Sequence, residues 1–174
     1  MATNYGPKWN ITPGIASTAT SRSLLHLSLS SSGGNLGGNY SHVVSSGGTT
    51  LYSGGANRSY RVSSYGVVNG TYQNISSAAL DVYGSTSEAA ALNTFLNNMS
   101  VGNLLVLTTY DEPANNRSYF NTNLATNFGA KLIDNLAFRY CYVLVAAKGK
   151  GLIYEDYGSD TQFKAVTLVI GNAS

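Results

Sequence analysis

Apolar and polar residues alternate along the first part of the chain in the pattern of a half-buried strand. Leu25, Leu27 and Leu29 share one side of the segment 23–31, and His26 points to the other side, which favours a surface histidine. Pairs of glycines follow at 33–34, 37–38, 47–48 and 54–55. Glycine tolerates the backbone angles of tight turns, so these pairs predict turns that link short strands. One of these short strands is expected at 40–44.

The middle of the chain predicts a hairpin followed by a helix. Segments 60–68 and 75–83 read as strands, and Asn69-Gly70 between them is a strong two-residue turn signal. Thr86 or Ser87 can cap a helix over about 87–99. Its apolar residues recur at helical spacing and predict one buried face: Ala91, Leu92, Phe95, Leu96 and Met99.

Two short apolar runs, at 103–110 and 140–147, have the character of central strands. Between them, segment 119–128 predicts a second helix with Tyr119, Phe120, Leu124 and Phe128 as its apolar residues, and Gly129 stands where a left-handed helix end is expected. Two last strands are expected at 152–156 and 163–170. Both faces of the last one are mostly apolar, so it is expected to be buried or to pack in an oligomer.

These elements predict an α+β fold with mostly antiparallel β-sheets packed with two α-helices around one core. A chain of 174 residues fits one domain. Residues 1–20 hold two of the three prolines and read as an extended N-terminal arm, which Trp9 and Ile11 could anchor on a neighbouring surface. The domain is then expected to span 21–174.

Composition limits the classes of partner. Charged residues make up only 10% of the chain, and a net charge of +2 without a Lys/Arg cluster gives no footprint for nucleic acid. No apolar run reaches the ~20 residues of a membrane helix, so membrane insertion is not expected. No signal peptide is visible. Tyr- and Asn-rich, weakly charged surfaces suit glycan contacts or packing between virion proteins.

The single cysteine, Cys141, lies in a predicted central strand and is expected to be a small buried hydrophobic residue. No intrachain disulfide can form, and no Cys/His spacing indicates zinc. No cofactor is expected.

The most distinctive polar residues border the two central strands: Asp111 and Glu112 follow the first, and Arg139 precedes the second. A carboxylate and a guanidinium at adjacent strand ends can pair with each other or point together at a polar ligand, and the sequence leaves both open. Adjacent acids point to opposite sides of an extended segment, which is poor geometry for a hydrolase. A calcium site with Asn115 is a further option, although its spacing matches no known calcium loop. No catalytic residue is expected.

Several motifs stand in order along the chain: ALDVYGSTSEAAALNTFLNNM at 79–99, YDEPA at 110–114, FGA at 128–130, LAFR at 136–139 and AAKG at 146–149. Together they resemble the interleukin-like EMT inducer family, also called PANDER-like, most strongly over 58–150. The resemblance implies the ββα domain of that family. Animal members are secreted and disulfide-bonded, so the lone cysteine departs from them.

The resemblance also implies a candidate ligand site. In one relative that binds a sugar without transforming it, an acid and an arginine that match Asp111 and Arg139 contact the glycan. Glu112 lies beside them, and Tyr110 or Tyr140 could supply a stacking ring. The opposing interpretation is a structural salt bridge between Asp111 and Arg139.

Domains of this family also occur in tailed-phage fibre proteins. The first expectation is therefore a non-enzymatic virion structural or tail-fibre-associated protein, located in the virion, that self-associates or binds other virion proteins and recognises a host surface. The alternatives are a carbohydrate-binding module for cell-surface glycans that uses Asp111 and Arg139, and a secreted, extracellular cytokine-like signalling protein.

Overall fold

The computed structural model describes residues 23–36, 41–55 and 58–171. The expected arm at 1–20, with Trp9 and Ile11, and the glycine pair 37–38 lie outside these residues. The described part contains two α-helices, α1 (Thr86–Asn98) and α2 (Asn121–Phe128), and two short 3-10 turns at Arg117–Tyr119 and Ile133–Asn135. Its strands are β1 (Leu24–Gly33), β2 (Ser41–Ser46), β3 (Thr49–Gly55), β4 (Ser59–Val68), β5 (Thr71–Leu80), β6 (Leu104–Asp111), β7 (Cys141–Ala147), β8 (Gly151–Gly158) and β9 (Phe163–Gly171).

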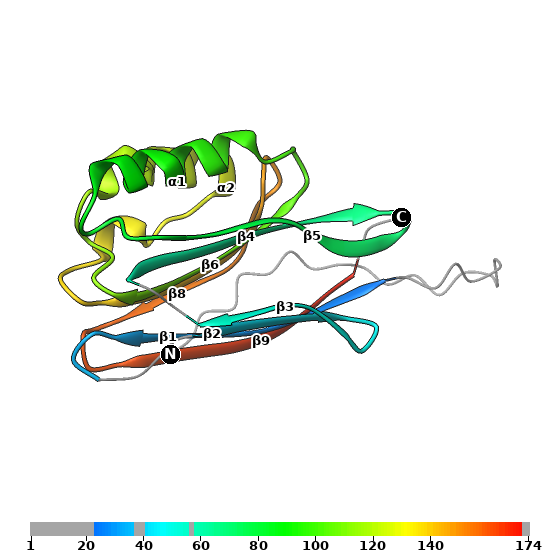
Figure 1. Cartoon of the computed structure of the whole chain (residues 1–174), viewed down its shortest axis with the longest axis horizontal. Helices are drawn as coiled ribbons and strands as arrows, with labels where there is room; N and C mark the ends of the chain where they lie inside the picture. Colours follow the sequence, from blue (N-terminus) through cyan, green and yellow to red (C-terminus); the bar gives the residue numbers. More distant parts are fainter. Residues whose placement is uncertain (1–22, 37–40, 56–57, 172–174) are drawn as a thin grey trace.

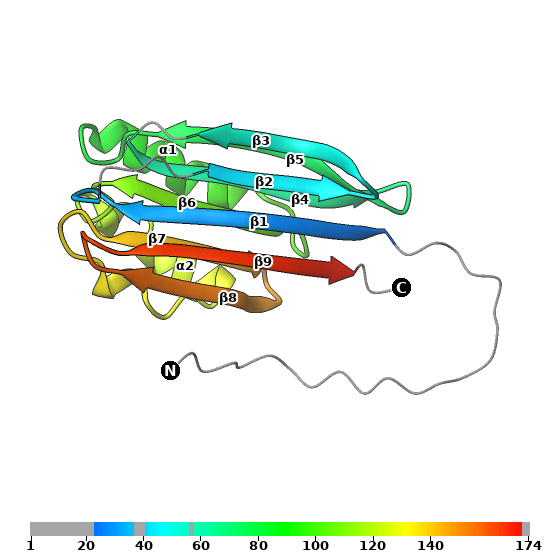
Figure 2. The ribbon, with the colours of Figure 1, turned by 90° about the horizontal axis from the view of Figure 1, so that it is seen from below.

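The strands form one hydrogen-bonded sheet that folds over into two layers (Figures 1 and 2). The outer layer has the order β3-β2-β1-β9, and the central layer has the order β5-β4-β6-β7-β8. The layers join where the end of β1 runs parallel to β6, at Ser32–Tyr110 and Gly33–Asp111. Both helices cover the remaining face of the central layer (Figure 1).

The α+β class predicted from the sequence is confirmed, because two helices pack on a β-rich chain. The sheet is mixed: β1 and β6 are parallel, and the other strand pairs among the described residues are antiparallel.

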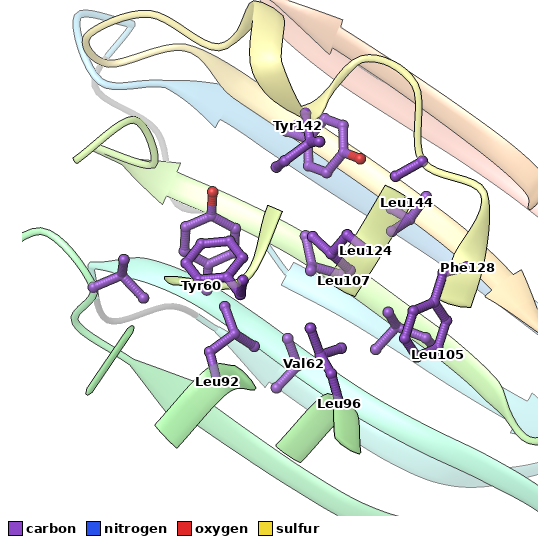
Figure 3. Close-up of a cluster of buried hydrophobic side chains, with 14 of the residues drawn as sticks. Tyr60, Val62, Leu92, Leu96, Leu105, Leu107, Leu124, Phe128, Tyr142 and Leu144 are labelled. Atoms are coloured by element: carbon purple, nitrogen blue, oxygen red, sulfur yellow. The ribbon is translucent and has the colours of Figure 1, made fainter. Parts of the chain in front are cut away.

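Two cores replace the single core that the sequence predicted. Leu105 and Leu107 of β6 pack beneath the helices, together with Leu92, Leu124 and Phe128 (Figure 3). Leu104 and Val106, on the opposite face of the same strand, pack against the outer layer. Successive strand residues point to opposite faces, so a continuous apolar run such as that of β6 supplies both cores.

Two of the predicted hairpin turns are confirmed. Asn69-Gly70 connects β4 to β5 and Gly47-Gly48 connects β2 to β3, all four residues with positive φ, as two-residue turns require. The prediction of a turn at Gly54-Gly55 is wrong, because this pair belongs to β3 and Gly54 lies opposite His42 of β2. Strand β5 also begins earlier and ends earlier than the expected 75–83.

Helix α1 differs from its prediction in two details. Ser85, rather than Thr86 or Ser87, is the N-cap, and its hydroxyl accepts a 3.3 Å hydrogen bond from the Glu88 backbone N–H. Ala89 is buried and Ala91 is exposed. The face that contacts the sheet therefore runs through Ala89, Leu92 and Leu96, which the run of three alanines leaves undetermined in the sequence.

Helix α2 begins at Asn121 rather than at 119, after a 3-10 turn that leaves Tyr119 46% exposed. Phe120, Leu124 and Phe128 are buried as predicted, and Gly129 ends the helix with a φ of 76°.

Burial was one of the two expectations for the last strand. Strand β9 is not buried. It pairs with β1, and its residues alternate between half-buried and exposed. Cys141 is buried as predicted, and burial raises the pKa of its thiol. None of the described helices is long and apolar enough to cross a membrane.

Candidate functional site

Three chain segments meet at the end of the molecule where the two layers join. Strand β6 ends at Asp111, Arg139 stands just before β7, and the end of β1 passes both. The Gly34 N–H donates to the Arg139 carbonyl oxygen over 2.9 Å. The predicted acid and arginine are therefore brought together, with the end of β1 beside them.

Gly34 is a close-packing position. A Cβ there would lie 2.7 Å from Asp111 Oδ1 and 2.9 Å from Arg139 Cδ. Such distances are too short for a carbon in van der Waals contact, so a side chain at this position would displace the Asp111 and Arg139 side chains. The turn expected at Gly33-Gly34 is confirmed, since the Leu36 N–H donates to the Gly33 carbonyl oxygen over 3.0 Å, and the pair also lets the backbone approach the two charged residues.

Asp111 and Arg139 both have left-handed backbone angles, with φ values of 63° and 61°. Non-glycine residues adopt this region at an energetic cost, and such residues concentrate at functional sites. Here Asp111 is the last residue of β6 and Arg139 lies just before β7. Both side chains stay partly accessible, 29% and 39% exposed.

The ion pair itself is a single contact of 3.4 Å between Arg139 Nε and Asp111 Oδ1. It is not the two-bond fork that gives arginine–carboxylate pairs their strength. Exposed pairs of this kind contribute about 0–1 kcal/mol to stability. The geometry therefore leaves hydrogen-bonding capacity on both groups.

Two residues that the sequence did not indicate extend the ion pair. Arg139 Nη1 donates to Asn35 Oδ1 over 2.7 Å, and Asn35 Nδ2 donates to Asp160 Oδ2 over 2.5 Å. We call Asn35, Asp111, Arg139 and Asp160 the Arg139 cluster. It contains two carboxylates and one guanidinium, so its net charge is negative. No local sequence signal could have found Asn35 and Asp160, which lie far from Arg139 along the chain.

Glu112 has a different position from its neighbour. Its side chain is only 3% exposed, and its carboxylate accepts hydrogen bonds from the backbone N–H groups of Ala114, Asn115 and Arg139 at 2.7, 3.3 and 2.7 Å. The residue therefore ties the loop after β6 to the start of β7. Its contacts are those of a residue that positions Arg139 rather than one that faces a ligand.

A ring that the sequence did not indicate, that of Phe138, lies beside the guanidinium. The Arg139 guanidinium carbon lies 5.3 Å from the Phe138 ring centre, and this ring is 61% exposed. Tyr140 instead stacks on Tyr157 at 6.3 Å and packs against the core beneath the helices. Tyr110 is half-buried, opposite Ser59 of β4 and Ser32 of β1.

A metal centre has no support in the described part of the chain, where no group of three or more His, Cys, Asp or Glu side chains is placed to hold an ion. Two of the three residues considered for calcium have other contacts. The Glu112 carboxylate is occupied by backbone N–H groups, and Asn115 Nδ2 donates to the Tyr83 carbonyl oxygen.

Comparison with known families gives one match. Residues 66–150 match the model of the family described as interleukin-like EMT inducer. This range contains Asp111 and Arg139 and confirms the resemblance over the central part of the chain. No curated protein matches the sequence.

Proposed function

We propose that this chain is a non-enzymatic recognition module that binds a neutral glycan with the Arg139 cluster, on the ββα fold that the family resemblance implies. The observation that carries the proposal is the open ion pair of Asp111 and Arg139, held by one 3.4 Å contact at an accessible end of the sheet. A purely structural pair would gain more from two-bond geometry. The same chain contains such a pair, Arg58 and Asp81, joined by bonds of 3.0 and 2.6 Å.

The chemistry of the cluster matches that of sugar hydroxyl groups. A hydroxyl can donate to the Asp111 carboxylate and accept from the Arg139 guanidinium at the same time. Nε and Nη1 of Arg139 have the partners described above, and among the described residues no acceptor takes Nη2. The exposed Phe138 ring offers an apolar surface for the C–H face of a sugar.

The charge of the cluster favours a neutral ligand. Asp111 and Asp160 together outweigh the Arg139 guanidinium, and the nearby Arg58 guanidinium is balanced by its own partner Asp81, so the local field is negative. A sugar acid, a sulfate or a phosphate would be repelled by this field. Neutral glycans are therefore expected to bind better than acidic ones.

The proposal is tested by probing an array of immobilised neutral and acidic glycans with the full chain and with Arg139→Ala. The variant is expected to lose binding to neutral glycans by at least about tenfold, the effect of losing one charged hydrogen bond, while its melting temperature changes little. Lys150→Ala, which removes an exposed cation from the turn between β7 and β8, is the control and should keep binding.

Two results would contradict the proposal. The first is wild-type protein that binds no glycan on the array. The second is an Arg139→Ala variant that keeps its binding but is strongly destabilised, which would establish the pair as a structural salt bridge.

A second candidate function, a self-associating virion or tail-fibre component, is favoured by the outward face of the β3-β2-β1-β9 layer. Leu24 is 43% exposed and Val169 is 56% exposed, on the side of this layer that faces away from the central strands. Exposed apolar side chains of Val43 and Phe163 lie on neighbouring strands of the same layer. Exposed apolar groups on one face support a surface that other copies or other proteins cover.

Light scattering distinguishes this candidate. A self-associating chain gives a molar mass of at least a dimer, and Val169→Lys is expected to lower that mass toward the monomer by placing a charge in the contact. A monomer at all concentrations would overturn self-association and leave the recognition module as the remaining function.

A further inference from the structure

The outer surface of the two helices carries a row of hydrogen-bonded asparagines that the recognition site does not use. Asn93 and Asn97 project from α1, and Asn123 and Asn127 project from α2. They line a shallow depression of about 350 Å³, together with Tyr119 and Thr122. The two helices lie over the face of the central layer that is turned away from β1 and β9 (Figure 1).

The hydrogen bonds of this row run in one direction. Asn127 Nδ2 donates to Asn123 Oδ1 over 2.9 Å, and Asn123 Nδ2 donates to both Asn93 Oδ1 and Asn97 Oδ1 over 2.8 Å. Each amide has one acceptor oxygen and two donor hydrogens. The bonds therefore leave the NH2 groups of Asn93 and Asn97 on one side of the depression and the Asn127 oxygen on the other.

The two helices do not need this row of asparagines in order to pack on the sheet. Leu92 and Leu96 of α1 and Leu124 and Phe128 of α2 are fully buried beneath them and hold both helices on the sheet (Figure 3). The asparagines bridge the helices above this core, with Asn97 exposed and Asn93 half-buried. Their effect is to fix side chains that would otherwise rotate freely, which lowers the entropy lost when a ligand binds.

We propose that this depression is a second binding site for a neutral saccharide. Its lining residues carry no formal charge, and the neighbouring Lys148 ammonium is bound by the carbonyl oxygens of Leu96, Asn97 and Met99 at the end of α1. A sugar hydroxyl accepts from the outward NH2 groups and also donates to the Asn127 oxygen, whereas a carboxylate only accepts and an ammonium only donates. Tyr119, 46% exposed, supplies a ring for the C–H face of the sugar.

The site is independent of the Arg139 cluster and does not rest on it. No residue is shared between them, and the cluster lies at the strand ends while the depression lies on the helices. Two weak sites on one chain can bind one extended glycan, or two chains of a glycan-covered surface, more strongly than either site alone.

The test is a titration of the ¹⁵N-labelled full chain with chitohexaose and maltohexaose as neutral probes and with trigalacturonic acid as an acidic probe. At least one neutral probe is expected to shift the side-chain NH2 signals of Asn93 and Asn97. The acidic probe is expected to leave them in place. Replacing Arg139 with alanine is expected to leave these shifts unchanged, which separates this site from the Arg139 cluster.

Variants of two neighbouring asparagines sharpen the test. Asn97→Ala removes an outward NH2 group and is expected to raise the dissociation constant about tenfold, as for one lost hydrogen bond. Asn98→Ala is the matched control, since Asn98 is an exposed residue of the same helix that does not line the depression.

The proposal is overturned if neither neutral probe shifts the asparagine signals, or if the acidic probe shifts them as strongly. It is also overturned if Asn97→Ala and Asn98→Ala bind equally well. A shift of the same signals with rising protein concentration and no sugar would instead identify a contact between two copies.

Discussion

The two faces of the central layer of strands are covered in different ways. The helix-covered face is apolar along its length: Val62, Leu105, Leu107 and Leu144 lie beneath α1 and α2 (Figure 3). The sheet-covered face is apolar only over part of its length, where Val106 packs against the leucines of β1.

Toward the junction with β1, the sheet-covered face becomes polar. His42 is fully buried there, with Nε2 3.0 Å from Ser63 Oγ, and its ring lies 4.9 Å from that of Tyr52. The Arg61 guanidinium stacks over the Tyr52 ring at 4.7 Å. Polar groups inside a protein cost free energy unless hydrogen-bonded, so this region contributes less to stability than the helix-covered face.

The main apolar core and the Arg139 cluster therefore lie in different parts of this fold. The helix-covered core is large enough to hold the central strands, and the polar interior lies toward the end where β1 meets β6 and the Arg139 cluster is built. Substitutions on the two faces should therefore have effects of different size and of different kind.

The largest effect is expected on the helix-covered face. Phe128→Ala should lower the free energy of unfolding by about 3–5 kcal/mol, because a fully buried ring is replaced by a cavity. Urea unfolding measures this value. Phe138→Ala, which removes a ring that is 61% exposed, is the control and should change it by no more than about 0.5 kcal/mol. Similar losses at both positions would contradict the assigned core.

The next effect is a pH dependence specific to the polar interior. Burial, and then the nearby Arg61 charge, lower the pKa of His42 from 6.5 to about 4. The unfolded chain therefore binds a proton more readily than the folded one between these values. The contribution of neutral His42 to the free energy of unfolding is complete above pH 6.5 and decreases as the pH drops to about 4. The loss over that window is up to about 3 kcal/mol.

Comparison with His42→Gln isolates this contribution. Carboxylates such as Asp81, whose pKa the Arg58 hydrogen bond lowers, also lose stability in acid, but they do so in both proteins. Unfolding free energies at pH 7 and pH 4 should differ less in the variant than in the wild type. Equal differences would show that His42 is not kept neutral by its surroundings.

The smallest effects on stability are expected for buried hydroxyl groups of the polar interior. They should differ between a hydroxyl that is hydrogen-bonded and one that is not. Ser31 Oγ donates to the Thr109 carbonyl oxygen over 2.6 Å and accepts from the Tyr142 N–H over 3.1 Å. Ser31→Ala should cost about 1–3 kcal/mol, because it leaves the buried Tyr142 N–H without its acceptor.

Thr108→Val is the matched substitution. Thr108 is also fully buried, yet its hydroxyl has no hydrogen-bond partner among the described residues. Removing it should be neutral or should raise stability by up to about 1 kcal/mol. If Thr108→Val costs as much as Ser31→Ala in urea unfolding, the polar interior is better bonded than the structure indicates.

Much of the local structure was predictable because the signals are local. Asn69-Gly70 and Gly47-Gly48 predict the hairpins that they connect. The alternation of Leu25, Leu27 and Leu29 predicts the buried side of β1. The predictions were wrong where two local arrangements of the chain have similar free energies. Three consecutive alanines allow either Ala89 or Ala91 to face the sheet, and only the position of α1 on the strands chooses between them.

The candidate site was predictable only in part. Asp111 and Arg139 flank the two most apolar strands, so their proximity follows once those strands pair. Asn35, Asp160 and Phe138 carried no comparable signal. Tyr110 or Tyr140 was expected to offer a stacking ring, and the Tyr140 ring stacks on Tyr157 and packs against the helix-covered core.

By itself, the sequence determined the helices, most strands, two hairpins and the two charged residues at the strand ends, because each depends on neighbours a few residues away. Only the tertiary structure decided that the end of β1, still paired with β9, also runs beside β6, which divides one expected core into two. The same step brings Gly34 and Asn35 against Arg139. Such contacts form between distant segments, where the free energy of packing both layers outweighs any local preference.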